Sequence, residues 1–282
     1  MDHTILERRG RLQQLVADAR DGADVTRAAL LLACEEYPEL DLEAYHEQLG
    51  AWALQAGRRM AEGGGPLSDV VDVVNDILFG DAGLRGNDED YYDPRNSFLN
   101  EVIDRRCGIP ITLSLIYMHV ATGAGASARG IGLPGHFVVG LQRAGEQVYV
   151  DPFHEGRPMS AADCQRMVEK LHGGRLPWRA EFLVPWSADR IMVRVLNNLK
   201  GIYLRDTNFE KALWVQDLLV MLAPDDPREL RDRGLINAQL AHYPAARSDL
   251  RAYLEKSPQR PEDAEAIERD LERLRRLHLM LN

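Results

Sequence analysis

The sequence predicts an α+β domain that is followed by all-α helical repeats. Apolar side chains in residues 67–78 recur at the spacing of one helix face. The period then shortens to that of strands in residues 136–141 and 147–151. After these strands the helical periodicity returns, and Pro224 and Pro258 stand 34 residues apart within it. Together these observations indicate a mixed core with a small antiparallel sheet and a separate helical array.

Composition excludes several classes of function. The chain has 282 residues, of which 45% are hydrophobic, so it is long enough to bury a substantial core. Its formal net charge of −10 repels phosphate backbones, and no nucleic-acid partner is therefore expected. Cys34, Cys107 and Cys164 are far apart and form no C-x-x-C pair. Neither a disulfide framework nor a zinc ribbon is predicted, and no cofactor is expected.

The sequence also bears on location. The first 22 residues mix charged side chains with scattered apolar ones and contain no continuous apolar region of the kind that a signal peptide has. The sequence contains no run of about 18 apolar residues that could cross a membrane. We therefore expect no membrane contact and a cytoplasmic location.

Two helical segments organise the predicted core. Residues 1–80 are expected to form a helical region that packs on a core at 81–185. The apolar stripe of the last N-terminal helix comprises Leu67, Val70, Val71, Val74, Ile77 and Leu78. Residues 110–122 are apolar almost all round, so this helix is predicted to be the buried centre of the domain. Pro110 suits its first turn, where the missing N–H would be unpaired in any case.

A β-hairpin is predicted from His136 to Asp151, with its turn at Ala144-Gly145. If Arg143 pairs with Glu146, His136 falls opposite residue 153 and Asp151 becomes its diagonal neighbour. Diagonal side chains on one face of a hairpin can meet. The hairpin thus predicts an imidazole beside a carboxylate.

Residues 186–282 are predicted to form tetratricopeptide-type repeats with a capping helix. Ala212 and Ala246 are 34 residues apart, and each is followed twelve residues later by a proline. Small side chains at this interval are typical of two helices that pack closely in each repeat. A final helix at 262–281 would close the stack, and such arrays commonly bind a protein or peptide partner.

Cys107, His136 and Asp151 are the candidate catalytic residues. A thiol near a helix start gains acidity from the helix dipole and from an imidazolium. The histidine accepts and returns the proton, and the aspartate fixes its tautomer. The chain order of a helix start, a strand with His and a strand with Asp is the layout of a cysteine-nucleophile fold.

Four sequence blocks extend this similarity. The blocks are Tyr92-Asp93-Pro94-Arg95-Asn96-Ser97-Phe98-Leu99-Asn100, Arg106-Cys107-Gly108-Ile109-Pro110-Ile111-Thr112-Leu113-Ser114, Gly132-Leu133-Pro134-Gly135-His136-Phe137 and Val150-Asp151-Pro152-Phe153. They run in the order of the SirB-type family, whose bacterial members carry a transglutaminase-like core followed by tetratricopeptide repeats, and the chain resembles that family over nearly its whole length. The resemblance implies a papain-type core, a bacterial origin and a cytoplasmic location, but no defined activity.

The nucleophile position departs from the active transglutaminase-like pattern. Active enzymes carry Gly-x-Cys at the helix start and a Gly-Ile-Pro-Ala-Arg-like segment further on. Residues 125–129 resemble the second segment, and counting back from them reaches Pro110 or Ile111 instead of a cysteine. Cys107 lies three residues before Pro110, so its apposition to His136 does not follow from the sequence.

This departure predicts a non-catalytic, degenerate transglutaminase-like protein that binds a peptide or protein partner. One alternative is a cysteine-dependent amidohydrolase or acyltransferase that uses Cys107, His136 and Asp151. Another is a purely structural scaffold, in which His136 and Asp151 satisfy each other's polar groups or Asp151 forms a turn.

Other candidate groups in the core fit a functional site less well. Thr112 and Ser114 are weaker nucleophile candidates because they lie inside the predicted helix. His136, Asp151, His154 and Glu155 are a conceivable ligand set, but the sequence contains no H-E-x-x-H, and no metal site is predicted.

Overall fold

The computed structural model describes residues 3–19, 22–63 and 65–280. The chain divides into two compact units, Met1–Val195 and Leu196–Asn282, and helix α8 (Ala188–Arg205) contains the boundary. This boundary lies beyond the sequence-based one at residue 185, and the three-part division at 80 and 185 stays a prediction. Within the described ranges, no helix has the length and apolar character needed to cross a membrane. The α+β class with a helical array is confirmed.

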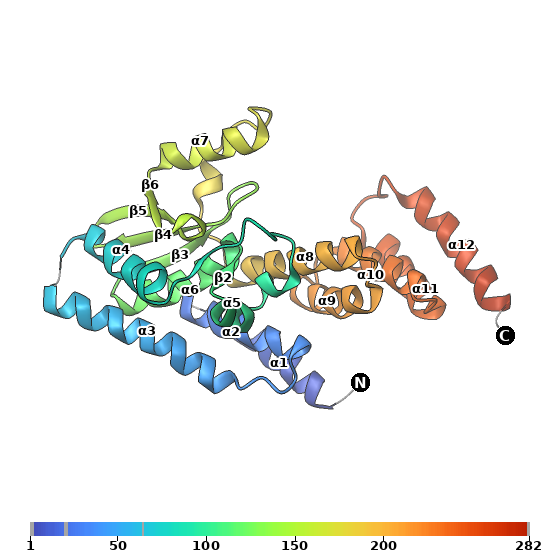
Figure 1. Ribbon diagram of the computed structural model, residues 1–282. Helices are drawn as coiled ribbons and strands as arrows, with labels where there is room; N and C mark the ends of the chain where they lie inside the picture. Colours follow the sequence, from blue (N-terminus) through green and yellow to red (C-terminus); the bar gives the residue numbers. More distant parts are fainter. Residues whose placement is uncertain (1–2, 20–21, 64, 281–282) are drawn as a thin grey trace. The chain divides into compact units, whose positions relative to one another are not determined.

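The first unit opens with a set of helices (Figure 1). The predicted stripe on the last of these is buried along its whole length. The α-helical part of that element ends at Asn75, and a π-helical turn carries the stripe onward to Ile77 and Leu78. The elements are α1 (His3–Asp18), α2 (Gly22–Glu36), α3 (Leu42–Gly63), α4 (Leu67–Asn75) and the π-helical turn η1 (Asp76–Asp81).

Helix α6 (Pro110–Gly123) forms the centre of the first unit, as predicted. It packs against α2 and α3 and against strands β3 (Ser127–Ile131) and β4 (Val138–Arg143) (Figure 1). Tyr117, near its middle, is fully buried and donates a hydrogen bond of 3.0 Å from its hydroxyl to Asn75 Oδ1. Asn75 Nδ2 in turn donates to the Gly156 carbonyl at 3.0 Å, so the central helix is tied to the turn that follows β5.

The main sheet has four antiparallel strands in the order β3-β4-β5-β6. Arg143 pairs with Glu146 and Val139 with Val150, which confirms the predicted hairpin register. The outer strands β3 and β6 were not predicted, because Ile131 is the one large apolar residue of β3 and β6 has only 3 residues. The strands are β3 (Ser127–Ile131), β4 (Val138–Arg143), β5 (Glu146–Asp151) and β6 (Arg157–Met159).

The predicted start of the first hairpin strand at His136 is wrong, since β4 begins at Val138. Leu133 to His136 form a tight turn in which the His136 N–H donates to the Leu133 carbonyl at 3.1 Å. Gly135 has φ +78°, a value that favours glycine at the third position of a type II turn after proline. His136 is therefore the last residue of a turn, and strand β4 begins two residues after it.

Shorter elements complete the first unit around α6. The two-residue strands β1 (Arg85–Gly86) and β2 (Cys107–Gly108) pair in parallel, so Cys107 lies on a short strand just before α6. Two 3-10 turns, one before helix α5 and one after β5, border the candidate site. The remaining elements are η2 (Pro94–Ser97), α5 (Leu99–Arg105), η3 (Pro152–His154), α7 (Ala161–His172) and η4 (Ala180–Leu183).

The second unit consists of antiparallel helices of the predicted repeat type. Gly234 allows close packing, because a Cβ there would lie 2.8 Å from the Leu250 side chain and 3.1 Å from the Ala246 carbonyl oxygen. Ala212 and Ala246 are fully buried, as the spacing argument requires. The helices after α8 are α9 (Phe209–Leu222), α10 (Pro227–Gln239), α11 (Tyr243–Lys256) and α12 (Ala264–Met280).

Candidate functional site

Asp151 is the centre of the candidate site. It ends β5 and is completely buried, and it is the N-cap of the 3-10 turn η3, whose first residue is Pro152. Its Oδ1 accepts a hydrogen bond of 3.1 Å from the Phe153 N–H. This backbone contact fixes the direction of the carboxylate, so the turn-forming role considered for Asp151 coexists with its place in the site.

His136 reaches the same carboxylate from the turn before β4. Its Nε2 lies 3.0 Å from both Oδ1 and Oδ2 of Asp151, and the residue is 8% exposed. Because an ionised carboxylate only accepts, Nε2 carries the proton in this arrangement. The opposite ring nitrogen, Nδ1, makes no hydrogen bond within the described part of the chain. That edge of the imidazole is the one that would serve a nucleophile.

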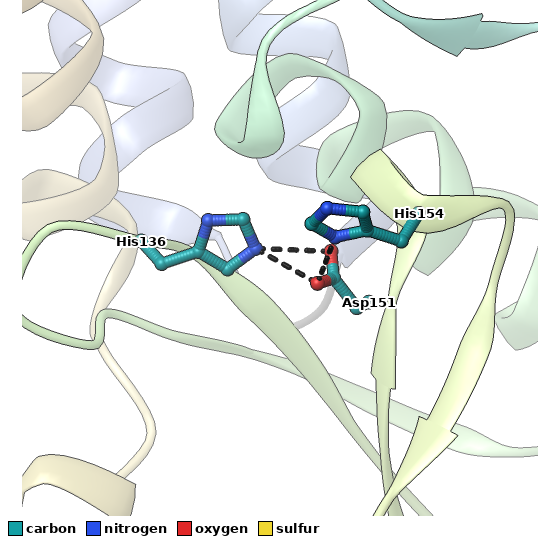
Figure 2. A group of neighbouring side chains, drawn as sticks. All are labelled: His136, Asp151 and His154. Atoms are coloured by element: carbon teal, nitrogen blue, oxygen red, sulfur yellow. Dashed lines mark hydrogen bonds and ion pairs between the residues drawn. The ribbon is translucent and has the colours of Figure 1, made fainter. Parts of the chain in front are cut away.

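His154 is a second imidazole on Asp151, which the sequence argument did not assign to this carboxylate. Its Nδ1 lies 2.7 Å from Oδ2 of Asp151, and its side chain is 57% exposed. Figure 2 shows both imidazoles directed at one carboxylate. The sequence signal that could have predicted this contact is Asp151-Pro152. An N-cap residue followed by proline predicts a helical turn, and such a turn brings His154, three residues further on, back beside the Asp151 side chain.

The charge on Asp151 depends on its two histidines. Burial by itself raises the pKa of the Asp151 carboxyl, because it penalises the charged form. The hydrogen bonds and charge interactions with His136 and His154 outweigh that cost and hold the pKa below its usual value of 3.8. Asp151 is therefore a carboxylate at neutral pH.

One aromatic ring contacts both imidazoles, and two tyrosines pack behind it. The Phe153 ring lies 6.1 Å from the His136 ring and 5.3 Å from the His154 ring, edge to face in both cases. Tyr91 packs on Phe153 with ring centroids 6.2 Å apart, and Tyr92 packs on Tyr91. The site thus has an aromatic wall, defined here as Tyr91, Tyr92 and Phe153.

A buried asparagine holds the loop that carries the two tyrosines. Asn96 is completely buried, and its Nδ2 donates to the carbonyls of Asp90 and Tyr91 at 2.7 and 3.3 Å. Its Oδ1 accepts from Asn87 Nδ2 at 2.9 Å. The loop that carries the two tyrosines of the aromatic wall is therefore held by a polar network of its own.

Cys107, the predicted nucleophile, lies on β2 ahead of α6. Its side chain is buried, with 7% of the residue exposed. Its sulfur makes no hydrogen bond to His136 or Asp151 in the described structure, and it does not share the cluster formed by His136, Asp151 and His154. The catalytic role of Cys107, His136 and Asp151 stays a prediction.

The weaker nucleophile candidates are in structural surroundings. Thr112 Oγ1 donates to the Asn96 carbonyl at 2.8 Å and accepts from the Ile109 N–H at 3.2 Å, so its hydroxyl closes the start of α6. Ser114 is fully buried inside α6, and its Oγ has no hydrogen-bond partner in the described part of the chain. Neither hydroxyl is bonded to His136.

Comparison with protein families divides the chain into two matched segments. Residues 43–197 match the family model described as the transglutaminase-like superfamily, which is more than half of the chain. Residues 199–272 match a tetratricopeptide repeat model. Both agree with the resemblance noted in the sequence.

Several curated proteins are similar over most of the chain. A UPF0162 protein of Xylella fastidiosa (strain 9a5c) is 38% identical over 234 residues, which cover 82% of this chain and 83% of the relative. A UPF0162 protein of Vibrio cholerae is 29% identical over 242 residues, with 86% and 89% covered. The F-box only protein 21 of Mus musculus is 26% identical over 188 residues, 63% of this chain but 29% of that protein. No solved structure matches the chain significantly.

Proposed function

Since the chain belongs to the transglutaminase-like superfamily and to the bacterial UPF0162 family, we propose that it is a non-catalytic interaction protein of the cytoplasm. It binds a peptide or protein partner through its transglutaminase-like domain and its tetratricopeptide repeats. Such repeats generally mediate contacts between proteins. The main support is that His136 and Asp151 are assembled while the sulfur of Cys107 is not hydrogen-bonded to them.

The start of α6 supports binding over bond cleavage. A thiol nucleophile gains most from the helix dipole when it lies on the first turn of the helix. Here Ile109 precedes α6, and Pro110 and Ile111 begin it. All three side chains are apolar and buried, so the dipole of α6 acts on no thiol at that turn.

The aromatic wall supports a partner at the core site. Tyr91 and Tyr92 are 38% and 59% exposed, and Tyr91 packs on Phe153, whose ring lies against both imidazoles. Tyrosine is enriched in protein interfaces, because its ring supplies a large contact area and its hydroxyl supplies a hydrogen bond. A peptide laid along this wall would also reach the free edge of His136.

The proposal is tested by the pH dependence of cysteine alkylation, read for each cysteine by peptide mass spectrometry. We expect the alkylation profile of Cys107 to be the same in the wild type and in His136→Ala, because no imidazole–thiolate pair exists to be broken. A Cys107 that reacts rapidly at neutral pH and loses this reactivity in His136→Ala would instead establish the thiol-enzyme alternative.

The other two cysteines are internal controls in the same sample. Burial raises the pKa of the Cys164 thiol to about 12, and burial also raises the pKa of Cys34. Both should alkylate slowly in either protein unless the chain unfolds, so fast reaction at Cys164 would flag a misfolded preparation. As a second readout, the gene for Cys107→Ser should complement a deletion strain as well as the wild-type gene does. Failure of this variant while folded would contradict a non-catalytic role.

A further inference from the structure

The group formed by His136, Asp151 and His154 has the composition of a metal site. We infer that these three side chains bind a divalent transition-metal ion such as Zn²⁺. Their ligand atoms all lie within 4.8 Å of one another, and they are the one such group of His, Cys, Asp and Glu side chains found across the described residues. Two imidazoles and one carboxylate are a recurrent ligand set for zinc and for non-haem iron, with positions left open for other ligands.

The separations within the group are slightly shorter than those of a tetrahedral zinc site, as expected for ligands that are hydrogen-bonded to one another before the ion arrives. Zinc lies about 2.0–2.2 Å from imidazole nitrogen and carboxylate oxygen, so neighbouring ligand atoms around a tetrahedral ion are roughly 3.3–3.6 Å apart. His136 Nε2 is 3.0 Å from each oxygen of Asp151. His154 Nδ1 is 2.7 Å from Oδ2, which requires only a small outward movement. This movement is available because His154 is 57% exposed at the end of a short turn.

The three ligands are held by separate backbone features. The Phe153 N–H orients Asp151, and the turn at Gly135 presents His136. His154 follows Asp151 by three residues on η3, and Asn75 anchors the carbonyl of Gly156 just beyond it. A ligand set that is fixed before the ion arrives loses little conformational entropy on binding.

Binding requires a change of tautomer at both histidines. In the structure the protons on His136 Nε2 and His154 Nδ1 point at the carboxylate. When the ion replaces them, each neutral imidazole carries its proton on the opposite ring nitrogen, and the coordinating nitrogens present lone pairs. The carboxylate supplies one negative charge to the divalent ion, and open positions remain for water or for an oxygen of a partner.

The sequence predicted no metal site at His136, Asp151, His154 and Glu155, because the chain lacks H-E-x-x-H. That motif places two histidines on one helix, whereas the three ligands inferred here come from a turn, a strand end and a 3-10 turn. The inference goes beyond partner binding and does not depend on it. Substitution of His154 tests the metal site alone, because His154 is not one of the candidate catalytic residues Cys107, His136 and Asp151.

The experiment is a calorimetric titration of the purified, chelator-treated full chain with Zn²⁺, followed by Co²⁺ absorption spectroscopy. We expect one equivalent to bind the wild type, and His154→Ala and Asp151→Asn to weaken binding at least about tenfold. His278→Ala, in the repeats, is the matched control and should bind as the wild type does. Circular dichroism verifies that each variant is folded.

Two results would overturn the metal site. One is the absence of stoichiometric binding to the folded wild type. The other is binding that is equally strong in His154→Ala, which would locate the ion elsewhere on the chain. Neither result bears on the alkylation experiment, because that measurement depends on Cys107 and not on His154. The failure of the metal site and the failure of the proposed function are therefore distinguishable.

Discussion

His136→Ala is expected to lower the free energy of unfolding by about 3 kcal/mol at neutral pH. The substitution removes a donor that contacts both oxygens of Asp151. The carboxylate stays completely buried and keeps only the Phe153 N–H and the half-exposed His154. An under-compensated buried charge is among the costliest changes that a single substitution can make. Urea unfolding of the metal-free protein measures the difference.

The loss of unfolding free energy caused by His136→Ala should be smaller at acidic pH. The pKa of Asp151 in the folded protein lies below the ordinary value of 3.8, so its stabilising contribution is complete above 3.8 and is lost as the pH falls through the folded value. Without His136 this contribution is smaller from the outset. The difference in unfolding free energy between the wild type and His136→Ala must then become smaller as the pH falls below 3.8.

The matched control for this prediction is His154→Ala. Its side chain is more than half exposed, so we expect a loss of no more than about 1 kcal/mol at neutral pH. A gap between the wild type and His136→Ala that is constant from neutral to acidic pH would show that lost packing, and not the charge on Asp151, causes the destabilisation.

Local patterns in the sequence predicted the parts of the fold that local physics decides. The register of the hairpin followed from its tight turn and from the period of two, and both are properties of about fifteen consecutive residues. The central helix α6 followed from its uniform apolar character. The repeats followed from small side chains at a fixed interval, and Gly234 shows why bulk is excluded there.

The site was less predictable because it depends on contacts between distant segments. The sequence predicted that His136 and Asp151 are neighbours, but it placed His136 on a strand, because Pro134-Gly135, a dipeptide typical of a type II turn, was not taken into account. The pairing of β1 with β2 joins residues about twenty positions apart and has no periodic signal. The sequence grouped His154 with Asp151 only as a conceivable metal ligand, because its hydrogen bond to Asp151 depends on the turn that Asp151 itself caps.

Gly132→Ala is the second substitution with a large expected effect, a loss of about 3 kcal/mol in the free energy of unfolding. A Cβ at this position would overlap three atoms of the Trp186 ring, well inside 3.0 Å. The ring has little freedom to move. It packs edge to face on Phe137 at 5.8 Å and under the Arg190 guanidinium at 4.0 Å. The backbone N–H of Trp186 donates to the Gly130 carbonyl at 2.9 Å, which also fixes the main chain that carries the ring.

Gly50→Ala is the control for the general effect of replacing glycine. Gly50 lies on an exposed position of α3, and a Cβ there would meet nothing within 4 Å. Since alanine favours helix over glycine, this variant should gain about 0.5–1 kcal/mol in thermal or urea unfolding. Opposite signs at Gly50 and Gly132 would show that the loss at Gly132 comes from its surroundings.

A double-mutant cycle with Trp186→Ala decides whether the indole ring is the cause. If overlap with the ring produces the loss, Gly132→Ala should cost almost nothing further once the ring is absent. The coupling free energy between the two positions should then approach about 3 kcal/mol, far above the few tenths expected for independent sites. Additive losses would instead place the strain in the backbone that leads into the turn at Gly135. In that case Gly132 would be required by the same loop that presents His136 to Asp151.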